Sequence, residues 1–316
     1  MTILYRDELF LQHDTGMHPE CAARLESVHA KLDDSGIMNR VTSGAIKSAA
    51  VETLTLTHTP KHVVRVDQLA QHGGGRLDPD TVVSPKSYEV ATHAAGTAIA
   101  AVDAVLGGEH QTALSLSRPP GHHALPDRAM GFCLFNNIAI AAKHAIGEHD
   151  LDRVLIVDWD VHHGNGTQDI FYDDGQVHFF SAHRHPFYPG TGDKDETGTG
   201  KGLGATLNLP LAFGISRGDY KDAFEDALET AVTRCRPQLV LVSAGFDAHT
   251  RDPIGSLGLE SEDFSDLTRM VTDVASQYCE GRVVSLLEGG YNVEALAESV
   301  LLHLEALIAT DDTKTE

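Results

Sequence analysis

Residues 154–164 read Val-Leu-Ile-Val-Asp-Trp-Asp-Val-His-His-Gly, an apolar run followed directly by two carboxylates and two imidazoles. Consecutive aliphatic residues of this kind are typical of a strand that is buried on both faces. Asp and His side chains are costly to remove from water unless they are paired or bind a cation. The stretch therefore predicts a core strand that ends in a metal-binding cluster, although Asp-x-His alone is more typical of a solvated acidic loop.

Short apolar runs of the same kind recur along the chain and alternate with longer segments whose apolar residues fall near helical spacing. This alternation predicts an α/β fold, with a central, mostly parallel β-sheet flanked by helices on both faces. No Pro/Ser-rich linker, repeat or change in composition divides the chain, so we expect a single domain over residues 1–316, with 310–316 as a loose tail. The expected strands are 113–116, 154–157, 177–180, 239–242 and 283–287, and the expected helices are 88–106, 133–146, 220–234, 261–278 and 293–307.

The overall charge narrows the class of partner. The 316 residues include 46 acidic and 24 basic side chains, which gives a formal net charge of -22. Such a charge disfavours binding to nucleic acid phosphates and favours cationic partners through long-range attraction. Basic protein tails and polyamines fit this charge, although an acidic surface also serves simply to keep a protein soluble.

Cysteine usage and the start of the chain indicate the compartment. The cysteines are widely spaced and form no C-x-x-C pair, which predicts neither a disulfide framework nor a thiolate zinc site. The first residues contain no basic segment followed by an apolar run, and no stretch approaches about 18 uncharged apolar residues. We therefore expect a cytoplasmic protein without a membrane span. The cysteines are Cys21, Cys133, Cys235 and Cys279.

Three further polar clusters follow expected strands. They are 118–123 (Arg-Pro-Pro-Gly-His-His), 243–249 (Ser-Ala-Gly-Phe-Asp-Ala-His) and 288–292 (Glu-Gly-Gly-Tyr-Asn). Open α/β sheets bind ligands at the carboxyl ends of their strands, so we expect these clusters to form one site. The glycine-rich segment 189–204 lacks the Gly-x-x-x-x-Gly-Lys-Ser/Thr pattern, so we do not expect nucleotide binding.

Together these clusters resemble the histone deacetylase family of zinc-dependent amidohydrolases. Residues 13–20, with Arg24 after them, are also similar to the amino-terminal segment of that family. The resemblance runs from about His13 to Asn292 and implies the arginase-deacetylase fold. It further implies zinc, or ferrous iron in the cell, as the catalytic metal.

We expect Asp160, His162 and Asp247 to be the metal ligands. Asp160 and His162 are two residues apart, so on an extended segment their side chains point to the same face and converge on one cation. Two carboxylates and one imidazole leave coordination positions open for water and substrate. This pattern is typical of a catalytic zinc rather than a structural one.

His122 and His123 follow a Pro-Pro-Gly turn, which can hold two imidazoles against a substrate carbonyl. Two adjacent loop histidines are, by themselves, usually ordinary surface residues. The resemblance pairs His122 with Asp158, and His123 with Asn165, a position where class I relatives usually carry Asp. We expect His123 to act as general base and then general acid, and His122 to stabilise charge electrostatically.

Tyr291 follows two glycines, a position where tyrosine is more often a packed turn residue. The resemblance assigns its hydroxyl to the substrate carbonyl, as a donor that stabilises the oxyanion. It also places Gly131, Phe132 and Tyr188 along a narrow tube for an acyl-lysine stem, with Ile254 at the rim. Polyamine-selective animal relatives carry Glu at that rim position, so Ile254 favours acyl-lysine over acetylated polyamines.

The resemblance also implies structural potassium at two places. The first site would use main-chain oxygens of Asp158, Asp160 and His162 together with Ser181 and Ala182, and the second would involve Phe171, Asp174 and Val177.

Two other classes of function compete with a deacetylase. Arginase-like ureohydrolases need a second metal and an Asp-x-Asp pair near Asp247, where this chain has Ala248 and His249. A silent acyl-lysine binding module would be favoured by loss of a ligand, of the histidine pair or of Tyr291, and all of these are present. We therefore expect an amide hydrolase similar to bacterial members, acting on acyl-lysine in proteins or peptides first and on acetylated polyamines second. The oligomeric state stays open.

Overall fold

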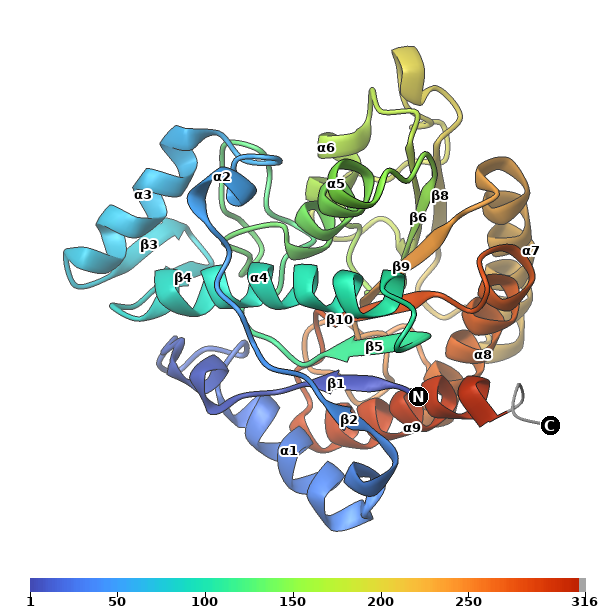
Figure 1. The fold of residues 1–316 in the computed structure, drawn as a ribbon, viewed down its shortest axis with the longest axis horizontal. Helices are drawn as coiled ribbons and strands as arrows, with labels where there is room; N and C mark the ends of the chain where they lie inside the picture. The colour runs from blue at the N-terminus through green and yellow to red at the C-terminus, as the bar shows by residue number, and fades with distance from the viewer. Residues whose placement is uncertain (313–316) are drawn as a thin grey trace.

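The computed structural model describes residues 1–312, and its centre is an eight-stranded sheet (Figure 1). The strand order is β2-β1-β5-β10-β9-β6-β7-β8, and every neighbouring pair in this sheet is parallel. The predicted α/β fold with a mostly parallel sheet is confirmed. The strands are β1 (Ile3–Tyr5), β2 (Thr42–Ser43), β5 (Thr112–Ser115), β6 (Val154–Asp158), β7 (Val177–Arg184), β8 (Thr206–Leu211), β9 (Leu239–Ala244) and β10 (Val283–Leu287).

Helices cover both faces of the sheet, as Figure 1 shows. One face packs against α4 (Ser87–Leu106), α5 (Asn137–His149) and the short α6 (Asn165–Phe171). The other face packs against α1 (Ala23–Ser35), α7 (Arg217–Cys235), α8 (Ser261–Tyr278) and α9 (Val293–Asp312). A smaller lobe beside α4 contains α2 (Val51–Leu54), α3 (Pro60–Gln71) and the antiparallel pair β3 (Gly75–Asp78) and β4 (Thr81–Val83).

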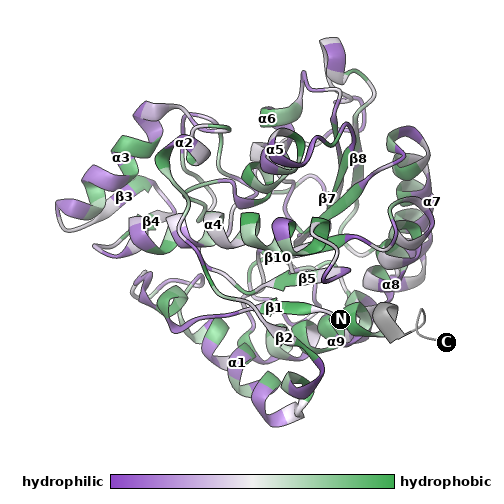
Figure 2. Ribbon diagram, viewed as in Figure 1, coloured by the Kyte–Doolittle hydropathy of each residue, from purple (hydrophilic) through white to green (hydrophobic). Residues whose placement is uncertain are grey.

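Side chains of the central strands alternate between two cores. In β6, Leu155 and Val157 pack into the core that includes α7, α8 and α9, whereas Val154 and Ile156 pack into the core that includes α4 and α5. All four side chains are completely buried. Figure 2 shows the hydrophobic residues gathered on the strands of the sheet. Burial on both faces explains why the sequence reads as an unbroken apolar run.

Several boundaries differ from those expected from sequence. Helix α5 begins at Asn137 rather than Cys133, because the Asn136 side chain caps the helix by accepting from the Ala139 N–H. Helix α9 continues to Asp312, so the expected loose tail does not begin at residue 310. The rest of that expected tail, 313–316, lies outside the described residues. Helix α8 has the predicted bounds, Ser261–Tyr278.

Other elements were not expected from sequence, namely β1, β2, β3, β4, β8, α1, α2, α3, α6 and three short 3-10 turns (Glu8–Gln12, Ile37–Arg40 and Gly200–Gly202). Strand β8 contains Pro210, which lacks an N–H, and it lies at the sheet edge where that loss is tolerated. All four cysteines are free thiols. Among the described residues, no helix combines the length and apolar character needed to span a membrane.

Candidate active site

The expected polar clusters meet at one edge of the sheet. Strands β5, β10, β9 and β6 are neighbours, and they run in the same direction. Their carboxyl ends therefore open on the same side, and the polar segments 118–123, 288–291, 245–249 and 159–164 follow them. This is the edge at which open parallel sheets bind ligands.

Asp160, His162 and Asp247 form a buried cluster whose ligand atoms all lie within 4.8 Å of one another. The His162 Nδ1 lies 3.0 Å from Asp160 Oδ1 and 3.1 Å from Asp247 Oδ2. Backbone N–H groups fix both carboxylates, since Gly289 donates to Asp160 Oδ2 at 2.9 Å and Val161 to Asp247 Oδ1 at 2.8 Å. Two carboxylates thus face one imidazole in the interior, a donor set that fits a divalent cation.

The way in which Asp160 and His162 converge differs from the expected extended segment. Strand β6 ends at Asp158, and the backbone bends over the next residues. The His162 N–H donates to Asp160 Oδ1 at 2.9 Å, and the Asp160 N–H donates to Asp158 Oδ1 at 3.1 Å. Each is an aspartate that accepts from the residue two positions later, an Asx turn. Consecutive turns, rather than strand alternation, therefore bring the side chains together.

Glycine is required where the backbone approaches these carboxylates. A Cβ on Gly289 would lie 2.2 Å from Asp247 Oδ2 and 2.5 Å from Asp160 Oδ2. Gly131, at φ +56°, would place a Cβ 2.3 Å from His123 Cδ2. Any side chain at these positions would displace a candidate ligand or the imidazole.

The two adjacent histidines pair as expected with different partners. His122 Nδ1 lies 2.9 Å from Asp158 Oδ2, and His123 Nδ1 lies 2.7 Å from Asn165 Oδ1. The two rings are 4.0 Å apart between centroids. Because each Nδ1 faces an acceptor, the Nε2 atoms are left for other contacts.

Electrostatics separate the two histidines. Burial lowers the pKa of His122, but Asp158, Asp160 and Glu288 outweigh it and raise that pKa to about 10. Burial, together with the neighbouring His122 and His162, holds the pKa of His123 well below its ordinary value. The surroundings therefore shift the pKa values of the two rings in opposite directions.

The electrostatics of the cluster of Asp160, His162 and Asp247 favour a bound positive charge. Burial lowers the pKa of His162, but hydrogen bonds to Asp160 and Asp247 raise it to about 10. Burial and the charge of Asp160 raise the pKa of Asp247 to about 7. Protons are held here because two carboxylates share a site from which water is excluded, and a divalent cation would match the same charge.

The expected substrate residues line one cavity of about 250 Å³ beside the cluster. Phe132 lies perpendicular to Tyr291, with ring centroids 5.6 Å apart, and Tyr188 lies perpendicular to His123 at 5.3 Å. Phe132 has φ +70°, in the left-handed region that a bulky residue rarely adopts. The lining is Asp80, His123, Gly131, Phe132, His162, Phe187, Tyr188, Ile254 and Tyr291, of which Asp80 and Phe187 were not expected.

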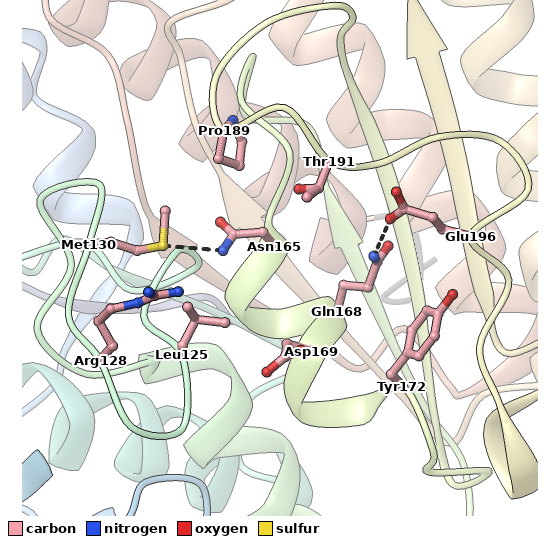
Figure 3. Close-up of a pocket in the computed structure, with 10 residues that line it drawn as sticks. All are labelled: Leu125, Arg128, Met130, Asn165, Gln168, Asp169, Tyr172, Pro189, Thr191 and Glu196. Atoms are coloured by element: carbon pink, nitrogen blue, oxygen red, sulfur yellow. Dashed lines mark hydrogen bonds between the residues drawn. The ribbon is translucent and has the colours of Figure 1, made fainter.

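A second hollow, with a volume of about 490 Å³, has Asn165 and Met130 on its lining (Figure 3). The Asn165 Nδ2 donates to Met130 Sδ at 3.5 Å, while its Oδ1 accepts from His123. Figure 3 also shows Gln168 bonded to Glu196 across the far wall of this hollow. The Asn165 side chain thus lines this hollow and also fixes the tautomer of His123, with the proton on Nδ1.

The residues of the expected potassium sites lie in two places. Asp158 and Ser181 are paired in register between β6 and β7, and Ala182 is the next residue of β7. At the second place, the Asp174 N–H donates to the Phe171 carbonyl at 3.0 Å, close to the start of β7 at Val177. The Lys143 ammonium contacts Asp174 Oδ2 at 2.5 Å. The positive charge of this lysine therefore already balances the negative charge of that carboxylate.

Glu288 holds three site segments together, a role that sequence reasoning missed. Its Oε2 accepts from the Gly121 N–H at 2.6 Å and the His122 N–H at 3.2 Å, and its Oε1 accepts from Ser243 Oγ at 3.2 Å. These bonds connect the ends of β10, β5 and β9. The position of Glu288 directly after a core strand was the available sequence signal.

Asp252 was also missed, and it positions Tyr291. Its Oδ2 accepts from the Tyr291 N–H at 2.7 Å, while its Oδ1 accepts from the Ile254 and Gly255 N–H groups at 2.9 Å each. The Asp-Pro pair signals a turn, but the partner 39 residues away is visible only in three dimensions.

We expect Asp252→Ala to lower kcat about 10- to 100-fold, because Tyr291 loses the acceptor that fixes its backbone. Asp252→Asn keeps one acceptor oxygen, for either the Tyr291 N–H or the Ile254 and Gly255 N–H groups, and should recover only part of that loss. Steady-state kinetics and bound zinc should be measured together, since a positioning role predicts unchanged zinc content. An Asp252→Ala enzyme with unaltered kcat would remove this role.

A buried ion network lies below the site. Glu20 pairs with Arg118 through both carboxylate oxygens and with Arg24 at 3.2 Å. Arg24 donates in turn to the carbonyls of Glu288 and Gly290, each at 2.6 Å. Burial raises the pKa of Glu20, but Arg118 outweighs it and lowers that pKa to about 2. The network joins the amino-terminal segment to the loops that carry the histidine pair and Tyr291.

Glu20→Gln should lower the free energy of unfolding at pH 7 by about 3 kcal/mol, because it leaves two buried arginines without their carboxylate. The folded pKa lies below the ordinary value of 4.5. The carboxylate therefore stabilises the fold fully above about pH 4.5 and progressively less as pH falls toward about 2. In urea unfolding, the difference in free energy of unfolding between wild type and variant should decrease as pH falls over that range. The exposed Glu26→Gln serves as the control, and a constant difference would contradict the assignment.

The fold and this site define the class of protein. The chain belongs to the histone deacetylase family, since the family model for the histone deacetylase domain matches residues 18–307. It is 42% identical to a histone deacetylase-like amidohydrolase of Pseudomonas aeruginosa, over 92% of this chain and 82% of that protein. It is 38% identical to a probable deacetylase of Archaeoglobus fulgidus, over 98% of this chain and 86% of that protein.

Two further comparisons are with a longer relative and with a solved structure. The chain is 39% identical to the human polyamine deacetylase HDAC10, over 97% of this chain and 48% of that longer protein. The crystal structure of the HDA15 HD domain matches with a TM-score of 0.92 and 36% identity, covering 98% of this chain and 88% of that one.

Proposed function

We propose that this chain is a zinc-dependent deacylase that hydrolyses the amide bond of N-ε-acyl-lysine in proteins or peptides. The observation that carries the proposal is the convergence of Asp160, His162 and Asp247 beside an aromatic cavity that also presents His123 and Tyr291. Membership of the histone deacetylase family supports a hydrolase of this class.

Zinc is the proposed cofactor, with Asp160, His162 and Asp247 as its ligands, and ferrous iron is the alternative in the cell. When bound, zinc would polarise the acyl carbonyl and lower the pKa of a coordinated water. The backbone donors at Gly289 and Val161 hold the carboxylates, so little reorganisation is needed on binding. For potassium, the site around Ser181 fits better than the one around Asp174, which Lys143 already neutralises.

The proton transfers are assigned to His123. Its Nδ1 is held by Asn165, so its Nε2 is the atom that takes a proton from the attacking water and returns it to the departing lysine amine. His122, held by Asp158 with its ring tilted 41° against that of His123, supplies positive charge close to the reacting carbon. The Tyr291 hydroxyl donates to the carbonyl oxygen as negative charge develops there.

The acyl-lysine preference rests on the shape of the cavity. Phe132 and Tyr188 provide aromatic walls for the methylene chain of lysine, and Gly131 leaves room beside them. Ile254 keeps its part of the lining apolar, so it offers nothing to a distant ammonium group.

Acetylated polyamines are the second candidate substrate, and two observations favour them. Asp80 is one of the residues that line the cavity, and its carboxylate is the candidate partner for a substrate cation. A relative that is 39% identical is named a polyamine deacetylase. The distinction therefore depends on whether Asp80 alone suffices or whether a carboxylate at position 254 is needed.

We expect kcat/KM to be higher for an acetyl-lysine peptide than for acetylspermidine or acetylputrescine. Ile254→Glu should raise kcat/KM for acetylspermidine about tenfold or more, because one ion pair in a partly desolvated cavity contributes about 1 to 2 kcal/mol. Ile254→Gln has nearly the same shape without the charge and should leave acetylspermidine turnover low. Wild-type turnover of the amines alone would reverse the substrate assignment.

A further inference from the structure

We propose that the chain carries a second transition-metal site, formed by Asp103, His144 and His149 on the outer ends of α4 and α5, which takes zinc or a similar divalent ion. The site is separate from the candidate active site and does not depend on the proposed function.

The geometry of these three residues is already close to that of a metal site. His144 Nε2 and His149 Nε2 lie 2.7 Å and 2.9 Å from the same oxygen, Asp103 Oδ1. The three ligand atoms lie within 4.8 Å of one another. In tetrahedral zinc sites neighbouring ligand atoms are about 3.3 Å apart, so each contact needs to open by only about half an ångström.

The charge at the site also suits a cation. Partial burial raises the pKa of Asp103, but the hydrogen bonds from His149 and His144 outweigh it and keep that pKa below its ordinary value. One carboxylate and two imidazoles thus meet at a single point between the two helices. The side chains are 15% (His144), 27% (His149) and 41% (Asp103) exposed, so an ion and its remaining water ligands have access.

The ligand types select the class of metal. Two imidazoles and a single carboxylate suit zinc, copper, nickel or cobalt, whereas magnesium and calcium prefer sites made of oxygens. Three protein ligands leave a position for water. The net charge of -22 raises the local concentration of any cation near the surface.

The position of the site suggests a structural role. His149 is the last residue of α5, and the helix is about 18 Å long between Asn137 and His149. At its other end, Asn137 donates to the Pro119 carbonyl in the loop that carries the histidine pair. The ion would thus join α4 to α5 at the end remote from the active site, where alanines already bring the two helices together, including Ala98, Ala101, Ala142 and Ala145.

The test is the number of zinc ions that the full chain retains. Metal-free protein is equilibrated with micromolar buffered free zinc, separated by gel filtration, and analysed for zinc per chain. We expect wild type to bind one zinc more than the double variant His144→Gln/His149→Gln. The thermal midpoint of the double variant should rise less on zinc addition than that of wild type.

Three controls keep the result interpretable. His72→Gln removes an exposed histidine whose Nδ1 contacts the Gln68 carbonyl, and it should bind as much zinc as wild type. Asp103→Asn keeps an oxygen acceptor for both histidines but removes the charge, so it should also bind one zinc fewer than wild type. This variant provides the test if the double variant fails to fold. Magnesium should not compete. Equal zinc content in wild type, the double variant and Asp103→Asn, or a second zinc bound only at millimolar concentrations, would overturn the proposal.

Discussion

Asp247→Asn is expected to bind one zinc fewer than wild type and to lose amide hydrolysis by about 10³-fold or more. Asp247 supplies one of the two carboxylates around His162 Nδ1, and its other oxygen accepts from the Val161 N–H. Asparagine keeps the shape but removes the charge that a divalent cation needs. Zinc per chain and acetate release should be measured on the same preparation.

The matched control for this variant is Asp222→Asn, an exposed aspartate on α7. It should retain wild-type zinc content and turnover. If Asp247→Asn kept both, the ligand set would have to lie elsewhere, and the assignment of Asp160 and His162 would fall with it.

Tyr291→Phe is expected to lower kcat by about 10² to 10³-fold with little change in KM or zinc content. The phenol lies on the cavity wall, and Phe132 packs perpendicular to its ring. Removing the hydroxyl leaves the aromatic packing in place, so the change isolates one hydrogen bond made in the transition state. Tyr278→Phe, on the exposed side of α8, should be without effect.

A Tyr291→Phe enzyme whose kcat stays within a few fold of wild type would show that the hydroxyl is not the oxyanion donor. A large rise in KM at constant kcat would instead indicate a role in binding the ground state.

The sheet could be predicted where strands are long and buried on both faces. The aliphatic run of β6 and the amphipathic pattern of α8 can be recognised from sequence as a strand and a helix, because packing in the core requires apolar residues at these positions. Strand β1 has only three residues, and β8 contains a proline at a sheet edge. Their place in the fold depends on pairing with β5 and β7, which is information held by distant parts of the chain.

The candidate site could be predicted from residue types and motif order, but its supports could not. Asp160, His162 and Asp247 do come together, but Asp160 and His162 do so through Asx turns rather than an extended backbone. Glu20, Asp252 and Glu288 act through partners far away in sequence. Arg118, for example, is 98 positions after Glu20. A local pattern cannot specify such a partner, because burial and distance are properties of the folded chain.

The most direct test of the central claim is acetate release from an acetyl-lysine peptide by the metal-free chain before and after zinc is restored. The account predicts no turnover without metal, recovery with zinc, and no recovery when Asp247→Asn is treated in the same way. Equal turnover with and without metal would contradict it, as would a zinc-loaded wild type that releases no acetate from the peptide or from acetylspermidine.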